Sequence, residues 1–156
     1  MTPLPGRPLA PSAYAFSDDP SRWLSWDDVE VRLGEARYYW LASASADGVP
    51  HATPVMGVWV DLALYVEGLE TARWARNLAA NPRVTAHLES AENVVIVDAV
   101  AEKPVMSGHE GIVGAWASKY GRPLPAAVLG DLFRLRPSVV RAWSSTSLKD
   151  GTRFTF

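Results

Sequence analysis

The alternation of hydrophobic and polar residues predicts many short strands with a few helices between them. An aromatic run over residues 38–45 and an apolar run over 49–60 are both typical of strands, and Asp47-Gly48 between them favours a tight hairpin turn. Similar runs predict further strands over residues 62–67, 83–89, 94–102, 131–135, 139–143 and 153–156.

Strands and helices do not alternate regularly along the chain, as a parallel sheet would require. We therefore expect a mainly β protein of the α+β class with about six to eight antiparallel strands. Closure of the sheet into a β-barrel is the expected solution, because closure removes exposed strand edges. The helices are then expected to lie at the periphery.

Two early segments carry the signals of helix starts. Ser25-Trp26-Asp27-Asp28 has the form of a capping box, and the helix after it is expected to reach Ala36. Thr71 is expected to cap a helix over residues 72–80, which Asn81-Pro82 ends because the residue before a proline is driven out of helical geometry.

A third helical region is expected over residues 104–120, where apolar residues recur every four positions on one face: Ile112, Trp116 and Tyr120. A short helix near residues 126–129 is expected to follow it. Trp59, Trp116 and Tyr120 are candidates for a pocket that accepts a planar substrate, although packing in the core explains them equally well.

The first residues of the chain differ from the rest in composition. Five prolines fall within residues 1–22, which excludes a regular helix or a central strand there. We expect an arm over 1–22 and a single domain over 23–156. The arm is either disordered or laid over a neighbouring surface, where Tyr14 and Phe16 are candidate anchors.

The composition is that of an ordinary globular domain. Of the 156 residues, 48% are hydrophobic and 21% are charged, and the net charge of −2 gives no sign of a nucleic-acid binder. We expect no membrane span and no signal peptide, because the chain has no apolar run of the required kind. The absence of cysteine excludes disulfides and thiolate metal sites, and a cytoplasmic location is the default expectation.

The motifs of common enzyme classes are missing. The chain has three histidines, but it has neither the serine-hydrolase elbow, nor a zinc-binding histidine pair, nor a glycine-rich phosphate loop. No metal site is predicted, and no catalytic side chain is assigned.

The expected helix at residues 72–80 is the best candidate for a phosphate site. A helix N-terminus presents free N–H groups and a positive dipole end, and Thr71, Arg73, Arg76 and Asn77 would surround it. The alternative is an ordinary solvated helix with a basic face. Trp74 either packs under the barrel or stacks on a planar ligand.

The strand over 49–60 is the second candidate feature. Pro50 and Pro54 remove donors from its ladder, which leaves backbone groups of this strand free to bond the edge of a flavin-type ring. The alternative is that the prolines only bend a barrel strand.

Several short pieces occur here in a characteristic order: Tyr39-Trp40-Leu41-Ala42, Asp47-Gly48-x-Pro50-His51-x-x-Pro54-Val55, Leu64-Tyr65 and Arg73-x-Ala75-Arg76-Asn77-Leu78-x-x-Asn81-Pro82-Arg83-Val84. In this order and spacing they resemble the pyridoxamine-phosphate-oxidase-like superfamily of flavin and deazaflavin split barrels. Three later pieces resemble a group common in actinobacteria: Leu135-Arg136-Pro137, Ala142-Trp143 and Arg153-Phe154.

The resemblance implies a six-stranded antiparallel split β-barrel of the FMN-binding type that forms a homodimer. FMN, or coenzyme F-420 as the close alternative, would lie between the subunits, with its ring on the strand at Pro54–Met56 and its phosphate at the helix of Thr71–Leu78. The implied function is hydride transfer to or from a small organic substrate. Vitamin B6 synthesis is not expected, because the substrate-binding pattern of the true oxidases is missing.

The chain departs from this resemblance at Trp74, where relatives usually carry lysine, and two carboxylates, Glu67 and Glu70, precede the helix. Weaker cofactor binding, a different cofactor and no cofactor therefore all remain open. The alternative function is a non-catalytic ligand- or cofactor-binding barrel, including a haem-related one, that has lost strong phosphate anchoring.

Overall fold

The computed structural model describes residues 2–104 and 110–156. The strands are β1 (Leu4–Gly6), β2 (Tyr38–Ala44), β3 (Pro50–Val60), β4 (Ala63–Val66), β5 (Arg83–His87), β6 (Asn93–Glu102), β7 (Phe133–Ser144) and β8 (Thr152–Thr155). The α-helices are α1 (Trp26–Glu35), α2 (Arg73–Ala80) and α3 (Glu110–Tyr120). Short 3₁₀-helices lie at Ser12–Tyr14, Pro20–Arg22, Ala126–Asp131 and Leu148–Asp150.

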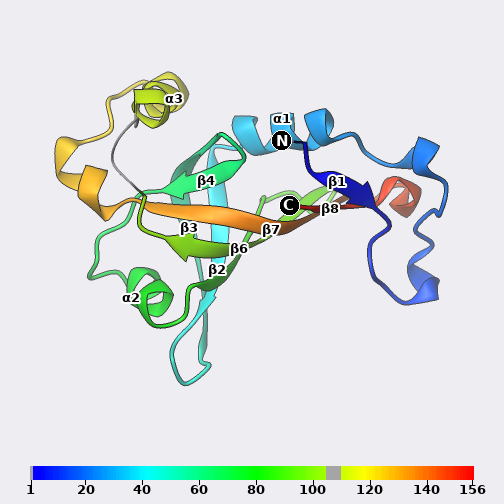
Figure 1. Ribbon diagram of the computed structural model, residues 1–156, viewed down its shortest axis with the longest axis horizontal. Coiled ribbons are helices and arrows are strands. Elements are labelled where there is room, and N and C mark those ends of the chain that lie inside the picture. Colours follow the sequence, from blue (N-terminus) through cyan, green and yellow to red (C-terminus); the bar gives the residue numbers. More distant parts are fainter. Residues whose placement is uncertain (1, 105–109) are drawn as a thin grey trace.

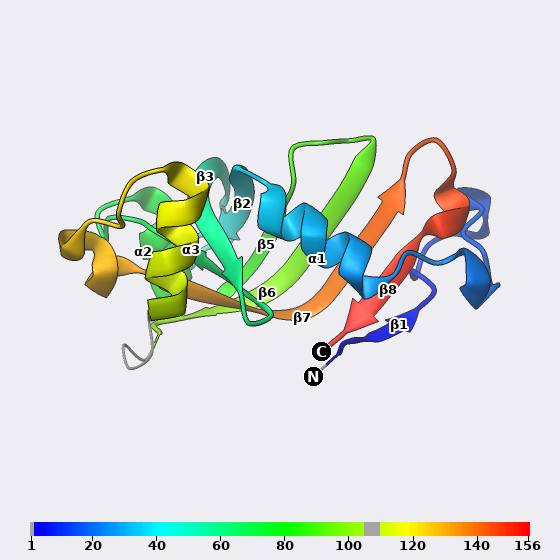
Figure 2. The same ribbon diagram turned by 90° about the horizontal axis from the view of Figure 1, so that it is seen from above.

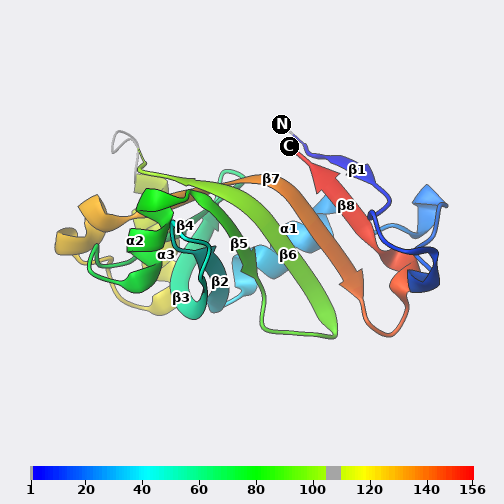
Figure 3. The same ribbon diagram turned by 90° about the horizontal axis from the view of Figure 1, so that it is seen from below.

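Six of the strands form a closed antiparallel barrel. Their order is β7-β4-β3-β2-β5-β6, and a further pairing between β6 and β7 closes the ring. β8 pairs with the second half of β7, and β1 pairs with β8, so that the sheet continues beyond the barrel (Figure 3). The predicted antiparallel barrel with peripheral helices is confirmed.

The C-terminal strands differ from the prediction in one respect. Two strands were expected around Pro137, but β7 is one continuous strand through it. Pro137 lies between the residues of β7 that pair with β4, which end at Leu135, and those that pair with β8, which begin at Val139. The β6–β7 register also shifts here, so Ser138 is bulged. Because the ladders are interrupted at this point, β7 can accommodate a residue without an N–H group.

The first helix begins as its sequence predicts. The Ser25 hydroxyl accepts the N–H of Asp28 at 3.1 Å, and the same hydroxyl donates to the Asp28 carboxylate at 2.6 Å. Val29 and Leu33 are buried in the core that fills the barrel, and α1 lies across the strands (Figure 2). The helix therefore covers one opening of the barrel with the apolar face that its periodicity predicts.

The apolar interior has two parts. The larger part fills the barrel and includes the buried faces of α1 and α2. The smaller part lies outside β3, where Val58 packs against Ile112 and Trp116 of α3. Trp116 is fully buried, so the core interpretation holds for this residue. Residues 105–109 of the expected third helix lie outside the described residues.

The N-terminal segment is attached to the domain at several points. β1 is an edge strand, which is where a strand that contains Pro5 is tolerated. Phe16 is 7% exposed and meets Trp143 with ring centroids 6.0 Å apart, whereas Tyr14 is exposed. Phe16 is thus the anchor of the pair.

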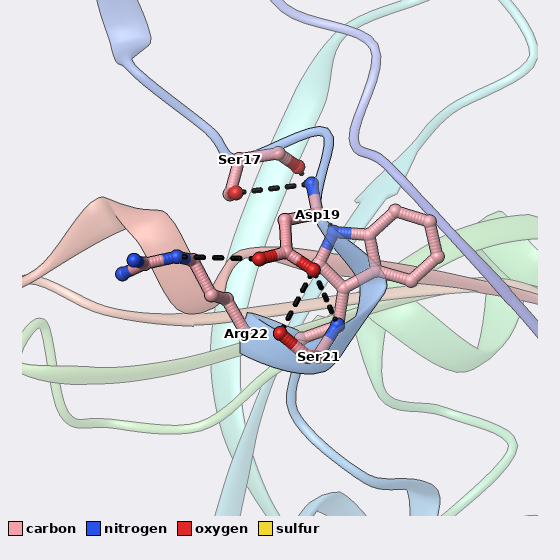
Figure 4. A network of polar contacts seen from close by, with 5 residues as sticks. Ser17, Asp19, Ser21 and Arg22 are labelled. Carbon is pink, nitrogen blue, oxygen red and sulfur yellow. Dashed lines mark hydrogen bonds and ion pairs between the residues drawn. The ribbon is translucent and has the colours of Figure 1, made fainter.

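A small polar network holds the turn after Phe16. The Asp19 carboxylate accepts hydrogen bonds from the N–H and hydroxyl of Ser21 at 3.0 and 2.8 Å, and Arg22 lies 3.6 Å away (Figure 4). These bonds from Ser21 lower the pKa of Asp19, with Arg22 a smaller cause. The Ser17 hydroxyl accepts the Asp19 N–H at 3.1 Å.

Candidate functional site

The start of α2 is not capped by Thr71, which corrects the prediction from the sequence. The cap residue is Ala72, and no side chain bonds the first N–H groups of the helix. The Thr71 carbonyl instead accepts a hydrogen bond from the guanidinium of Arg76. The N–H groups at this end therefore lack the side-chain partner that a capping Ser, Thr, Asp or Asn would supply.

Trp74 lies in the core and not at the mouth of a phosphate site. Its side chain is 6% exposed and meets Phe133 edge to face, with ring centroids 5.4 Å apart. A methyl group at Gly68 would come within 1.9 Å of the Trp74 ring. The sequence left open whether Trp74 packs in the core or stacks on a ligand, and its burial favours the core.

The remaining candidates on α2 face different neighbours. Asn77 is buried and donates its amide to the Ser43 hydroxyl at 3.1 Å, which ties α2 to β2. Arg73 is exposed and close enough to the β2–β3 hairpin that its charge helps to lower the pKa of Asp47, after larger contributions from hydrogen bonds. Arg76, unlike Arg73, lines a cavity together with Ala75. The structure therefore does not gather all the predicted phosphate ligands at one point.

The two carboxylates before α2 do not converge on Arg73. Glu67 is half-buried; burial raises the pKa of the Tyr120 phenol, and the charge of Glu67 is a minor further cause. Glu70 lines the same cavity as Arg76. Within residues 2–104 and 110–156, no ion pair joins either carboxylate to Arg73.

The candidate ring-lining segment lies where β3 changes partners. Residues 50–56 pair with β2, whereas pairing with β4 begins only at Gly57. In the described chain, the other edge of residues 50–56 thus has no strand partner. Pro54 is exposed, Met56 is half-buried and the Val55 side chain points into the core. The segment therefore offers a free backbone edge, as the prolines suggested.

The opposite edge of β3 beyond Met56 is covered by side chains from α3. The Tyr120 hydroxyl accepts the Gly57 N–H at 2.9 Å and lies 2.8 Å from the Arg37 carbonyl. The Lys119 ammonium donates to the Gly57 carbonyl at 3.0 Å and to the Tyr39 hydroxyl at 2.9 Å. Burial lowers the pKa of Lys119 to about 8. Sequence reasoning placed Tyr120 on an apolar face and missed this role.

A partly exposed aromatic pair was also missed. Trp40 and His87 are opposite each other on β2 and β5, and their rings stack with 6° between the planes. The His87 Nδ1 lies 2.8 Å from the Leu88 carbonyl, so Nδ1 must carry the proton and Nε2 keeps its lone pair when the ring is neutral. Tyr38 is exposed on the same strand. Only the pairing of strands brings these rings together.

Comparison with solved structures shows which known fold this barrel shares. A structure described as a putative pyridoxamine 5′-phosphate oxidase from Listeria innocua superposes with a TM-score of 0.61 at 18% identity, covering 76% of this chain and 98% of that one. The chain has the pyridoxamine-phosphate-oxidase-like split-barrel fold. The assignment to an actinobacterial type stays a prediction.

Other split barrels that match have different descriptions. An F420 reductase aligns at 23% identity with a TM-score of 0.57, over 71% of this chain and 94% of that one. HutZ, a haem storage protein from Vibrio cholerae, aligns at 23% identity with a TM-score of 0.57, over 72% and 89%. No protein-family model and no curated protein matches the sequence. The shared property is therefore the fold.

Two general findings concern what else the site could hold. In the described parts of the chain, no group of three or more His, Asp or Glu side chains is placed to hold a metal ion. No described helix is long and apolar enough to cross a membrane.

Proposed function

We propose that this split barrel is an FMN- or deazaflavin-dependent oxidoreductase, with FMN the first candidate and coenzyme F-420 the close alternative. The observation that carries the proposal is the free backbone edge of β3 at Pro54–Met56, together with the start of α2, which has no side-chain cap. The helix α2 packs beside β2 and β3 (Figure 1). A free strand edge suits the hydrogen-bonding rim of a flavin-type ring, and an uncapped helix start suits a phosphate.

The described residues fit such a cofactor in part. Arg73 is the exposed guanidinium beside the first turn of α2, so it would hold the phosphate together with the helix N–H groups. The backbone at Pro54 and Met56 would hold the ring. Trp74 would support the helix from below, and Asn77 would fix α2 on β2 through Ser43.

When bound, the cofactor would supply the hydride chemistry, and the protein would supply orientation and electrostatics. No side chain is required to act as an acid or base, and none is assigned. The substrate is proposed only as a small organic molecule.

The absorption spectrum of the purified protein, followed by titration with FMN and with F-420, tests this proposal. A flavin band, or saturable binding of either cofactor, supports it. A colourless protein that binds neither cofactor overturns it.

The phosphate site is tested by replacing Arg73. Arg73→Ala should weaken cofactor binding by about tenfold to a hundredfold, which corresponds to a charge-assisted hydrogen bond of about 1.5–3 kcal/mol. Lys149→Ala is the matched control, because it removes one exposed positive charge at the distant Leu148–Asp150 turn. Equal loss in both variants would mean that only the net charge matters.

We also propose that the protein is a homodimer and that the outer face of β2 and β3 is the contact. Trp40 and Tyr38 are 36% and 47% exposed there, and Trp40 pairs with Pro54 across the strands. A second copy would cover these rings and close the cofactor groove. Sedimentation at micromolar concentration should give a dimer mass, and Trp40→Glu should give a monomer. A wild-type monomer contradicts the proposal.

A haem-binding barrel is the second candidate, and His87 is the observation that favours it. Its Nδ1 is held by a backbone carbonyl, so Nε2 would be free to bind the iron of a haem beside the Trp40 ring. Titration with haemin distinguishes the two functions. A Soret band that is lost in His87→Ala supports the haem function, whereas an unchanged band means that haem binds elsewhere.

A further inference from the structure

A cavity of about 530 Å³ lies beside α2, between this helix, the end of β6 and the start of β7. Its floor is apolar and includes Leu78, Ala101 and Phe133, whose side chains are buried in the core. None of residues 54–56 lines it, nor do Arg73 and Trp74. The cavity is therefore separate from the strand edge proposed for the cofactor ring, and its volume is within the usual range for small-molecule sites.

The charged groups around this cavity are unequal in sign. Arg76 and Lys103 line it, and no described ion pair joins either of them to a carboxylate. The Lys103 ammonium lies 4.2 Å from the centre of the Phe133 ring, so it stands directly above the apolar floor.

The acidic side chains offset these charges only partly. Glu102 is already paired with Arg134 at 2.9 Å and with Arg136 at 3.8 Å. Glu70 is the remaining carboxylate in the lining. The lining thus holds two basic and two acidic groups, and Arg134 and Arg136 beside it compensate the charge of Glu102, so that the local field favours an anion.

We propose that this cavity binds a small organic carboxylate with a flat apolar body. The body would lie on Leu78 and Ala101, beside the Phe133 ring that Lys103 covers, and the carboxylate would bridge Arg76 and Lys103. Arg76 is suited to this role because a guanidinium bonds a carboxylate through two parallel N–H groups, and one N–H already bonds the Thr71 carbonyl and holds the side chain in place. An inorganic ion would leave most of the apolar floor exposed to water.

The proposal does not depend on the cofactor function. The probe is 2-naphthoate, and its neutral counterpart 2-naphthamide serves as the control ligand. Binding is followed by backbone amide shifts in the NMR spectrum of the full chain. The expected shifts fall on Ala75, Ala79 and Ala101, and the naphthoate should bind at least tenfold more tightly than the amide.

The variants separate this site from the phosphate site at the start of α2. Arg76→Gln and Lys103→Gln should each weaken naphthoate binding by about tenfold, as the loss of one charge-assisted contact predicts. Arg73→Gln removes a charge from the same helix and should change the affinity less than twofold. Both arginines are exposed, so all the variants are expected to fold, and thermal unfolding verifies this.

Three outcomes overturn the proposal. The first is the absence of saturable shifts with millimolar naphthoate. The second is equal binding of the neutral amide, which would reduce the cavity to an apolar surface. The third is an equal loss of affinity in Arg73→Gln, which would place the anion at the start of α2.

Discussion

Replacement of Trp74 by lysine tests the interpretation of α2 most directly. The resemblance found in the sequence implies lysine at this position, so a phosphate site there would gain from the change. The structure predicts the opposite, because the indole is 6% exposed, packs on Phe133 and fills the space beside Gly68.

The magnitude follows from the loss of a buried aromatic ring. Removal of a buried Trp or Phe side chain lowers the free energy of unfolding by about 3–5 kcal/mol. At about 2–4 °C per kcal/mol for a domain of this size, Trp74→Lys should lower the melting temperature by roughly 6–20 °C. If the lysine side chain reaches solvent, the destabilisation is only the lost packing of the indole. If it stays buried, the cost of desolvating its charge adds to that destabilisation.

The assay is thermal unfolding followed by far-ultraviolet circular dichroism, because tryptophan fluorescence changes with the substitution itself. Ala80→Lys is the control, since it introduces the same residue at an exposed position of the same helix. It should melt within about 2 °C of the wild type, in line with a surface change of about 0.5 kcal/mol.

A double-mutant cycle with Gly68 tests the packing of Trp74 without introducing a charge. Gly68→Ala should be destabilising in the wild type, because the new methyl group would overlap the Trp74 ring, and much less so in the Trp74→Ala background. The reasoning is refuted if Trp74→Lys melts with the wild type and binds FMN more tightly. Position 74 would then face the ligand after all.

Three further predictions concern the rest of the fold. Burial lowers the pKa of Lys119 to about 8 from an ordinary 10.5, so between these two pH values the unfolded chain binds more protons than the folded one. The free energy of unfolding should therefore rise with pH across that window. Lys119→Met should abolish this rise in urea titrations, and an unchanged pH dependence would assign the rise to other groups. Ser25→Ala should lower the melting temperature by about 2–4 °C, because the loss of an N-cap costs about 1 kcal/mol of stability. Ser25→Asp should retain most of the stability that the cap contributes. Phe16→Ala should release the N-terminal segment and speed tryptic cleavage after Arg22, and cleavage at the wild-type rate would show that β1 alone holds the segment.

Local chemistry in the sequence was enough to predict most elements of the fold. The Asp47-Gly48 turn forms as expected, with φ of 84° at Gly48, because a tight hairpin needs a positive φ that glycine adopts at no cost. The Ser25 cap and the buried face of α1 also follow from residues within a few positions of one another. Such features depend on neighbours in the chain, which a sequence displays directly.

The candidate site depended on contacts that no local pattern contains. Periodicity places Trp74 on a face of α2, but only the packing of that helix on β2 and Phe133 decides that the face is buried. Pro137 interrupts a strand in sequence terms, yet the change of partners from β4 to β8 lets β7 continue through it. In the sequence, Tyr120 is one of several apolar positions on a helix face. Only the packing of α3 places its hydroxyl at the edge of β3.

The sequence by itself therefore determined the elements and their antiparallel arrangement, because hydrophobic period and turn chemistry are local properties. The resemblance to split barrels came instead from the order and spacing of short motifs. Tertiary structure alone decided which predicted ligands meet. Arg73 lies at the uncapped start of α2, Arg76 lines a separate cavity and Trp74 is buried. These positions depend on how residues far apart in the chain pack together.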